Sequence, residues 1–200
     1  MQVPLFPLST VLFPGGILAL RIFETRYLDM IRACMRRDGV FGVVLIKEGS
    51  EVGAAAQSYA VGTLASIVNW DMRQDGLLLV DVAGDGKFRV LQTQVQADQL
   101  LVGEVETLAA EPVQALPQAY DYMATIIRDL LPKIHPLYQS QQFPLRDAAW
   151  VGGRFAELLP LHPAEKQTLL ELDDPQRRLQ SLDSSFLALQ RQHAVDEDAT

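Results

Sequence analysis

The sequence predicts an α+β fold in which a β-rich first half is followed by a bundle of helices. Up to about residue 110, short apolar runs rich in β-branched side chains alternate with turn residues, a pattern typical of strands. After Glu111-Pro112 the apolar residues recur with the spacing of amphipathic helices. This change of period places a domain boundary near residues 112–117.

About seven short strands are expected in the first half. Pro4 and Pro7 should confine the first of them to a sheet edge or an extended arm, because proline cannot donate to a strand ladder. Asp75-Gly76 predicts a hairpin turn, and Gly84-Asp85-Gly86 predicts another. The expected strands cover residues 3–12, 17–22, 40–46, 59–68, 77–82, 87–91 and 101–108.

One helix is expected among these strands, over residues 24–37. Its apolar side chains (Tyr27, Leu28, Ile31, Cys34 and Met35) share one face, and Arg32 and Arg36 lie opposite. Asp38-Gly39 is expected to end the helix. Cys34 lies on the apolar stripe, so a buried structural thiol is expected there.

Four helices are expected in the second half, over residues 117–131, 145–159, 164–172 and from Asp174-Pro175 onward. Gly152-Gly153 inside the second of them predicts a close approach to a neighbouring element, because glycine otherwise weakens a helix. The expected division is a β domain over 1–112, a helical bundle over 113–195 and a disordered acidic tail over 196–200.

Length and charge exclude several classes of protein. The chain has 200 residues, of which 48% are apolar, which is enough for a core without disulfides. The net charge of −8 lies mostly in residues 101–200, and this acidity disfavours nonspecific binding to nucleic acid. The single cysteine, the absence of a basic leader and the lack of a long apolar run predict a soluble cytoplasmic protein without a membrane span.

No set of residues in the sequence predicts catalysis, a metal site or a cofactor. Gly86-Lys87 lacks the other residues of a phosphate-binding loop, and no serine stands in a G-x-S-x-G motif. His135, His162 and His193 are far apart in the chain, so local structural roles are expected for them. Asp173-Asp174 precedes proline and is explained as a helix cap. We therefore expect no enzyme activity.

Two groups of polar residues are candidates for a binding surface. Arg21, Glu24, Arg26 and Tyr27 lie at a strand-to-helix corner, where they form either an ion-paired helix start or the polar rim of a groove. Lys87 and Arg89 alternate with Phe88 and Val90, which predicts that both cations lie on the solvated face of a strand.

Several segments, in order along the chain, resemble the Lon protease N-terminal (substrate-binding) domain family. The resemblance covers nearly the whole chain, although Thr25 and Lys87 stand where the family often has proline and arginine. The matching segments are Pro4-Leu5-Phe6-Pro7-Leu8, Val11-Leu12-Phe13-Pro14-Gly15, Ile22-Phe23-Glu24, Arg26-Tyr27, Phe41-Gly42-Val43-Val44, Val61-Gly62-Thr63-Leu64-Ala65, Asp75-Gly76, Gly84 with Lys87-Phe88-Arg89-Val90, Glu165-Lys166-Gln167, Leu170-Glu171 and Arg178-Leu179.

The resemblance implies a PUA-like β barrel of about six to seven strands with one inserted helix, followed by a C-terminal helical bundle. It also implies a non-catalytic role in recognising proteins or exposed polypeptide. The full protease adds an ATPase module and a Ser-Lys proteolytic module, and this chain resembles a stand-alone N-terminal domain without them.

Three functions remain open at this point. The favoured one is a protein- or peptide-binding module whose groove is lined by Arg21, Glu24, Arg26 and Tyr27, with Arg89 next. The second is RNA binding, because PUA-like barrels include RNA-binding modules; its candidate patch is Arg21, Arg26, Arg32, Arg36, Arg37, Lys87 and Arg89. The third is an enzyme acting on a small ligand. Polypeptide segments or partner proteins are the expected partners, and the sequence does not determine an oligomeric state.

Overall fold

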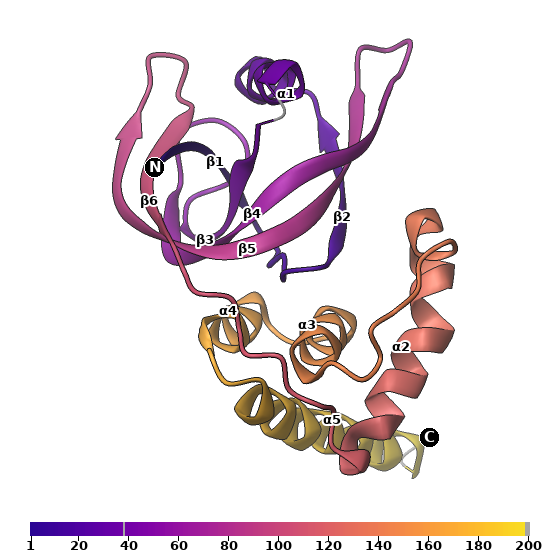
Figure 1. The fold of residues 1–200 in the computed structure, drawn as a ribbon. Coiled ribbons are helices and arrows are strands. Elements are labelled where there is room, and N and C mark those ends of the chain that lie inside the picture. Colours follow the sequence, from indigo (N-terminus) through magenta and orange to yellow (C-terminus); the bar gives the residue numbers. More distant parts are fainter. Residues whose placement is uncertain (38, 199–200) are drawn as a thin grey trace. The chain divides into compact units, whose positions relative to one another are not determined.

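Six strands and one helix form the first 110 residues in the computed structural model, which describes residues 1–37 and 39–198 (Figure 1). The chain divides into two compact units, Met1–Ala110 and Glu111–Thr200. The elements of the first unit are β1 (Gln2–Leu8), β2 (Ile17–Ile22), α1 (Thr25–Arg37), β3 (Phe41–Glu48), β4 (Gln57–Met72), β5 (Leu78–Val95) and β6 (Leu101–Thr107).

The strands form one mixed sheet in the order β2-β5-β4-β3-β1-β6, and β6 also pairs with β5. The β1–β3 pair is parallel and the other pairs are antiparallel. With the helices of the second unit, this sheet confirms the predicted α+β class.

Strand β1 is not at an edge, which corrects the expectation drawn from Pro4 and Pro7. Residues 2–5 pair with β6, and residues 5–8 pair with β3, so the two ladders overlap only at Leu5. Each proline therefore lies where β1 has a partner on one side only. A change of partner along the strand is what allows two prolines inside the sheet.

Strand β5 is continuous through Gly84-Asp85-Gly86, so the turn expected there is wrong and two expected strands are one. Ala65 of β4 pairs with Gly84, whereas Thr63 pairs with Lys87, so the register shifts at these glycines. They supply a bulge rather than a reversal. The hairpin expected at Asp75-Gly76 is present, with Gly76 at φ 83° and its N–H bonded to the Arg73 carbonyl at 3.1 Å.

Lys87 is buried, with 4% of its surface exposed, which corrects its expected place on a solvated face. It pairs across the ladder with Thr63, which is also buried and whose hydroxyl donates to the Leu12 carbonyl at 2.6 Å. Residues 11–13 are buried as well. Strand alternation alone predicts that the face with Thr63 and Lys87 is exposed to solvent. Residues 11–13 cover this face instead.

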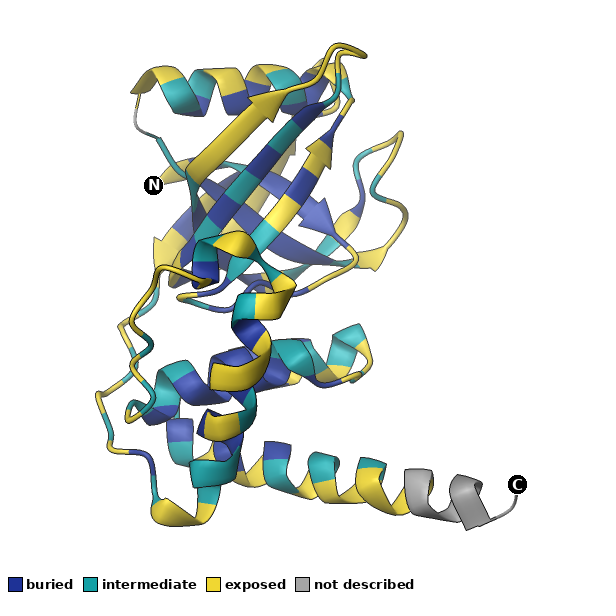
Figure 2. Cartoon of the chain, turned by 90° about the vertical axis from the view of Figure 1, so that its right-hand side faces the viewer, coloured by how far each residue is buried: buried dark blue, intermediate teal, exposed yellow. Residues whose placement is uncertain are grey.

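Two hydrophobic clusters make β1 buried on both faces. Figure 2 shows buried residues, in dark blue, along the strands of the first unit. Phe6 belongs to the first cluster, and its neighbour Leu5 belongs to the second. The first cluster includes the apolar face of α1 (Tyr27, Met30, Ile31 and Cys34), and the second consists of Val3, Leu5, Val44, Phe88, Leu101 and Val105. Since Cys34 is 7% exposed, the expectation of a buried thiol is confirmed.

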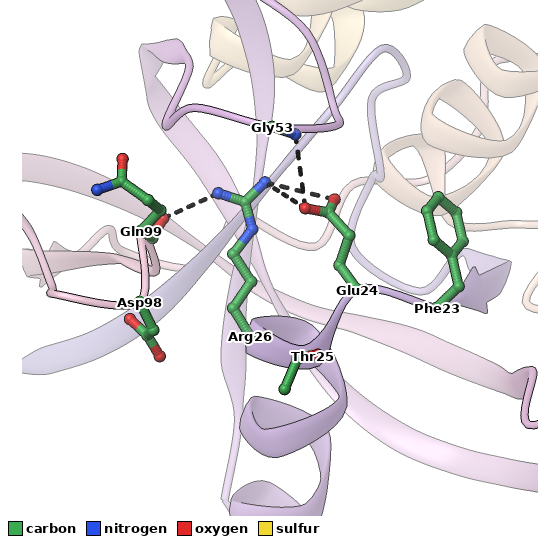
Figure 3. A pocket seen from close by; sticks show the side chains of 7 residues that line it. All are labelled: Phe23, Glu24, Thr25, Arg26, Gly53, Asp98 and Gln99. Atoms are coloured by element: carbon green, nitrogen blue, oxygen red, sulfur yellow. Dashed lines mark hydrogen bonds and ion pairs between the residues drawn. The ribbon is translucent and has the colours of Figure 1, made fainter.

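Helix α1 begins at Thr25, next to the ion pair between Glu24 and Arg26 (Figure 3). Its length agrees with the expected helix. At its other end the N–H of Gly39 donates to the Cys34 carbonyl at 2.9 Å, and Asp38 lies outside the described residues.

The second unit contains four α-helices and two 3₁₀ turns over the described residues 111–198. They are η1 (Gln118–Tyr120), α2 (Asp121–Ile134), η2 (Pro136–Tyr138), α3 (Ala148–Leu158), α4 (Pro163–Glu171) and α5 (Pro175–Asp198). Helix α3 begins later than expected because Asp147 caps it, accepting from the N–H of Ala149 at 2.9 Å. Helix α5 continues through Asp198, whereas a disordered tail was expected from residue 196; Ala199 and Thr200 lie outside the described residues. No described helix is long and apolar enough to cross a membrane.

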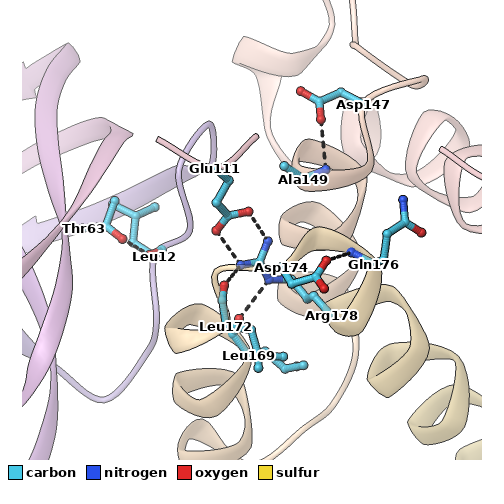
Figure 4. A network of polar contacts seen from close by, with 10 residues as sticks. All are labelled: Leu12, Thr63, Glu111, Asp147, Ala149, Leu169, Leu172, Asp174, Gln176 and Arg178. Carbon is cyan, nitrogen blue, oxygen red and sulfur yellow. Dashed lines mark hydrogen bonds and ion pairs between the residues drawn. The ribbon is translucent and has the colours of Figure 1, made fainter. Parts of the chain in front are cut away.

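The second unit is organised around the buried guanidinium of Arg178 on α5 (Figure 4). It binds both carboxylate oxygens of Glu111, at 2.6 and 2.5 Å, and also donates to the carbonyls of Leu169 and Leu172. A Cβ on Gly152 would lie 3.2 Å from the Arg178 side chain, so the close approach expected at this glycine is confirmed. Arg178 thus joins the first residue of the unit, the end of α4 and the start of α5.

We predict that Gly84→Ala destabilises the first unit and Gly86→Ala does not. A Cβ at Gly84 would stand 2.4 Å from the Phe13 carbonyl oxygen, whereas none of the surrounding atoms lies within 4 Å of one at Gly86. The clash should cost about 1–3 kcal/mol of unfolding free energy, measured in urea. Equal losses for the two variants would contradict this account of the bulge.

We predict that Glu111→Ala lowers the stability of the second unit by about 3–5 kcal/mol, because it leaves the Arg178 charge buried without its carboxylate. Arg146→Ala is the control, since Arg146 pairs with Asp121 but is 79% exposed. Loss of that exposed pair should cost at most about 1 kcal/mol. Thermal unfolding of both variants checks the difference, and similar melting temperatures would refute it.

Candidate functional site

An ion pair between the buried Arg26 and the partly exposed Glu24 marks the corner where β2 leads into α1. Arg26 is 6% exposed, and its Nη2 lies 3.0 Å from a Glu24 carboxylate oxygen. Its Nη1 donates to the Gln99 carbonyl at 2.9 Å, and Nη2 also donates to the Glu51 carbonyl at 3.4 Å. One side chain therefore connects the start of α1 with two loops that are distant in the sequence (Figure 3).

The first of these loops is the tight turn between β5 and β6. Gln99 has a φ of 68°, a left-handed conformation that costs energy in residues other than glycine. Its N–H donates to the Gln96 carbonyl at 2.9 Å, and Asp98 accepts from the N–H of Leu100 at 3.0 Å. The bond from Arg26 to the Gln99 carbonyl is one of the contacts that hold this conformation.

The second loop follows β3 and is held by two carboxylates. Glu51 accepts from the backbone N–H of Ser9 at 2.6 Å and from the Ser9 hydroxyl. Glu24 accepts from the N–H of Gly53 at 3.5 Å, in addition to its pairing with Arg26. The two carboxylates therefore attach the loop to the residue that follows β1 and to the residue that precedes α1.

Tyr27 is part of the core rather than the rim of a groove. It is 5% exposed and stacks on Phe6 with ring centroids 4.2 Å apart, while the Arg26 guanidinium lies 4.5 Å from its ring centre. Burial raises the pKa of the Tyr27 hydroxyl, Arg26 lowers it, and Glu24 and Glu51 raise it further. Tyr27 is thus expected to remain a neutral phenol at physiological pH.

An open hollow of about 400 Å³ lies over this corner. Next to it, a smaller cavity of about 40 Å³ reaches the side chains of Phe6 and Tyr27. Two apolar residues on the rim are unusually open to solvent: Phe23 is 61% exposed and Val52 is 54% exposed. The hollow is lined by Phe23, Glu24, Thr25, Arg26, Gly53, Asp98 and Gln99, and in Figure 3 Glu24 appears between Phe23 and Arg26.

The structure brings together four of the five candidate residues. Arg21, Glu24 and Tyr27 line the smaller cavity, and Glu24 and Arg26 line the larger one. Arg89 is elsewhere, exposed on β5 opposite Val61 of β4 and Glu106 of β6. Because Arg26 and Lys87 are buried, they cannot belong to a surface patch for RNA.

The site residues predicted from the sequence did not include Phe23, Val52, Asp98 and Gln99. Phe23 follows the buried Ile22, so strand alternation could have indicated that its ring points outward. No local signal brings residues 51–53 or 98–99 to this corner. Their place depends on the long-range bonds made by Arg26 and Glu24.

The described residues contain no group of three or more histidine, cysteine or acidic side chains suited to a metal ion. His135 and His162 each accept a backbone N–H through Nδ1, the second of them in a capping box at the start of α4, so their expected local roles are confirmed. The His193 side chain lies outside the described residues. Burial raises the pKa of the Cys34 thiol, which makes it a poor nucleophile.

Curated relatives match this chain over most of its length. It is 31% identical to Lon protease 2 of Myxococcus xanthus over 88% of the chain, and 25% identical to the Lon protease of Escherichia coli strain K12 over 91%. It is also 31% identical to the protein cereblon of Xenopus tropicalis over 58% of the chain. The chain spans about a quarter of the length of these relatives, 22%, 24% and 25% in turn.

Solved structures agree with the sequence relatives. The Lon N-terminal domain protein from Xanthomonas campestris superposes with a TM-score of 0.75 at 38% identity, over 92% of this chain and 98% of that one. The N-terminal domain of a Mycobacterium avium complex Lon protease shares the fold, with a TM-score of 0.61 at 18% identity over 91% and 96%. The sequence model of one protein family, the ATP-dependent protease La (LON) substrate-binding domain, matches residues 2–184 of this chain. The chain therefore belongs to the LON substrate-binding domain family.

Proposed function

We propose that this chain is a non-catalytic module that binds exposed segments of polypeptide, with one binding surface at the corner between β2 and α1. The observation that carries the proposal is the pair of exposed apolar side chains, Phe23 beside the hollow of about 400 Å³ and Val52 beside the smaller cavity next to it. Exposed apolar side chains with a polar rim are typical of protein-binding surfaces. Membership of a substrate-binding domain family supports the same function.

The candidate residues divide into two roles under this proposal. Arg21 is exposed, and Glu24 lies at the rim with 21% of its side chain exposed, so both are available to a bound polypeptide. Arg26 and Tyr27 are buried and act as positioning residues, which hold the two loops beneath the ligand. Arg89 would contact only a ligand that extends along β5, away from the corner.

We also infer that the first unit is a PUA-like β barrel. Because β6 pairs both with β1 and with β5, the strands β5, β4, β3, β1 and β6 form a ring of pairings. Strand β2 lies outside this ring and pairs with β5. The side chains of the second cluster come from β1, β3, β5 and β6, which supports a core enclosed by these strands. Helix α1 lies between β2 and β3, and one helix inserted among the strands supports the same inference.

We predict that Phe23→Ser weakens binding to a reduced and alkylated, permanently unfolded model protein by about tenfold. The variant removes apolar area that the ligand would cover, and a tenfold loss corresponds to about 1.4 kcal/mol. Fluorescence titration measures the dissociation constant. The double variant Arg26→Ala, Tyr27→Ala is unsuitable for this purpose, because loss of two buried side chains should unfold the corner.

The matched control is Val113→Ser, which alters an apolar side chain that is 90% exposed in the second unit. Its affinity should equal that of the unchanged chain. If the unchanged chain does not bind the unfolded protein at tens of micromolar, the proposed function is wrong. Equal affinity for Phe23→Ser and Val113→Ser would exclude the corner as the surface.

A further inference from the structure

Strands β4 and β5 separate at one end of the sheet and leave an unpaired edge. Their ladder ends where Val61 pairs with Arg89. Beyond it, β5 continues along β6 as far as the pair of Val95 with Leu101. In the described chain, Gln57 and Ser58 of β4 pair with β3, and none of residues 57–60 pairs with β5. The edge of β4 that faces β5 therefore has no ladder partner there.

The separation follows from irregular pairing on the other side of β4. The β3–β4 register shifts twice, between Val44 and Ile46 and again between Ile46 and Glu48. Such bulges increase the local twist of a strand and bend it. The first residues of β4 therefore turn away from β5 instead of continuing the hairpin.

A cavity of about 390 Å³ lies between the diverging ends of β4 and β5. Its volume is within the range of roughly 300–1,000 Å³ that is usual for ligand clefts. One wall consists of six consecutive residues, 55–60. Because successive side chains of a strand point to opposite faces, an unbroken run of lining residues shows that the backbone edge itself faces the cavity.

The remaining lining comes from Val90, Thr93, Val95 and Leu101. Leu101 belongs to the second hydrophobic cluster, and Val90 packs against that cluster, whereas Val95 is 47% exposed. The lining residues on the β4 side are Ala55, Ala56, Gln57, Ser58, Tyr59 and Ala60, so none of the ten carries a charge. A strand edge next to an uncharged, partly apolar floor suits an extended peptide with uncharged side chains.

We propose that an extended, uncharged polypeptide segment adds to the edge of β4 at residues 57–60 and places alternate side chains on Val90, Val95 and Leu101. The proposal rests on the polypeptide-binding function and gives it a second, distinct surface. Four residues of strand span about 13 Å, which is enough for a short run of main-chain hydrogen bonds. Main-chain pairing supplies affinity for many sequences, and the apolar floor excludes charged segments.

The test uses an acetylated octapeptide of alternating valine and threonine, and the same peptide with alternate backbone nitrogens methylated. Val95→Glu places a charge in the cavity and should weaken binding of the first peptide at least about tenfold. Gln94→Glu is the matched control, because it adds the same charge to the neighbouring residue of β5, which does not line the cavity. Its affinity should be unchanged, and the methylated peptide should not bind.

Amide hydrogen exchange provides a readout that does not depend on affinity. The first peptide should slow exchange of edge amides within residues 57–60 at least about tenfold, because they become hydrogen-bonded. Thermal unfolding confirms that Val95→Glu is folded, and the exposed Thr93→Glu replaces it if it is not. Unchanged exchange at residues 57–60 in the peptide complex would overturn the proposal.

The other outcomes separate this proposal from the proposed function. If the unfolded model protein binds the unchanged chain and Val95→Glu equally, the edge is not a binding surface, although polypeptide recognition stands. If neither the unfolded protein nor the peptide binds the unchanged chain, polypeptide recognition fails as well. If the unchanged chain is a dimer that Val95→Glu converts to a monomer, and no peptide binds, the edge belongs to a second copy and the proposal is overturned.

Discussion

The corner of the first unit depends on the ion pair and hydrogen bonds that the Arg26 guanidinium makes. A buried charge is tolerated only when it is paired and hydrogen-bonded, so the structure must bring acceptors to it. Glu24 provides the charge, and the carbonyls of Gln99 and Glu51 provide further acceptors. The sheet ladders do not connect these segments with one another, and Arg26 does so through its side chain. The loops on either side of the hollow are therefore fixed by one residue.

The second unit also has a buried arginine that binds a carboxylate and backbone carbonyls. Arg178 pairs with Glu111 and donates to the carbonyls of Leu169 and Leu172, which end α4. In both units a buried arginine binds a carboxylate and also donates to backbone carbonyls. Carbonyls in loops and in the last turn of a helix lack strand or helix partners, so each arginine satisfies groups that would be costly to bury alone. This arrangement allows irregular segments to be held firmly in a small unit.

The features predicted correctly from the sequence depend on short stretches of chain. The period of apolar residues gave the α+β class, helix α1 and the helical second unit, and the corner of Glu24 and Arg26 is likewise local. The errors have distant causes. Pro4 is inside the sheet because β1 changes partner along its length. Lys87 is buried because residues 11–13 lie over its neighbour Thr63. Arg26 is buried because its acceptors include the carbonyl of Gln99, which is 73 residues away in the sequence. None of these contacts leaves a pattern in neighbouring residues.

Both proposed binding surfaces lie where the regular hydrogen bonding of the sheet is interrupted. A fully paired strand has satisfied its backbone groups, so only an interruption leaves edges or exposed side chains for a ligand. The loop before β4 belongs to both surfaces: Val52 lies at the corner, and Ala55 and Ala56 line the cavity beside β5. Arg26 and Glu24 bind this loop at Glu51 and Gly53. The ion pair of Arg26 and Glu24 therefore positions the start of the open edge of β4 as well as the corner, and a variant that frees the loop should alter both surfaces together.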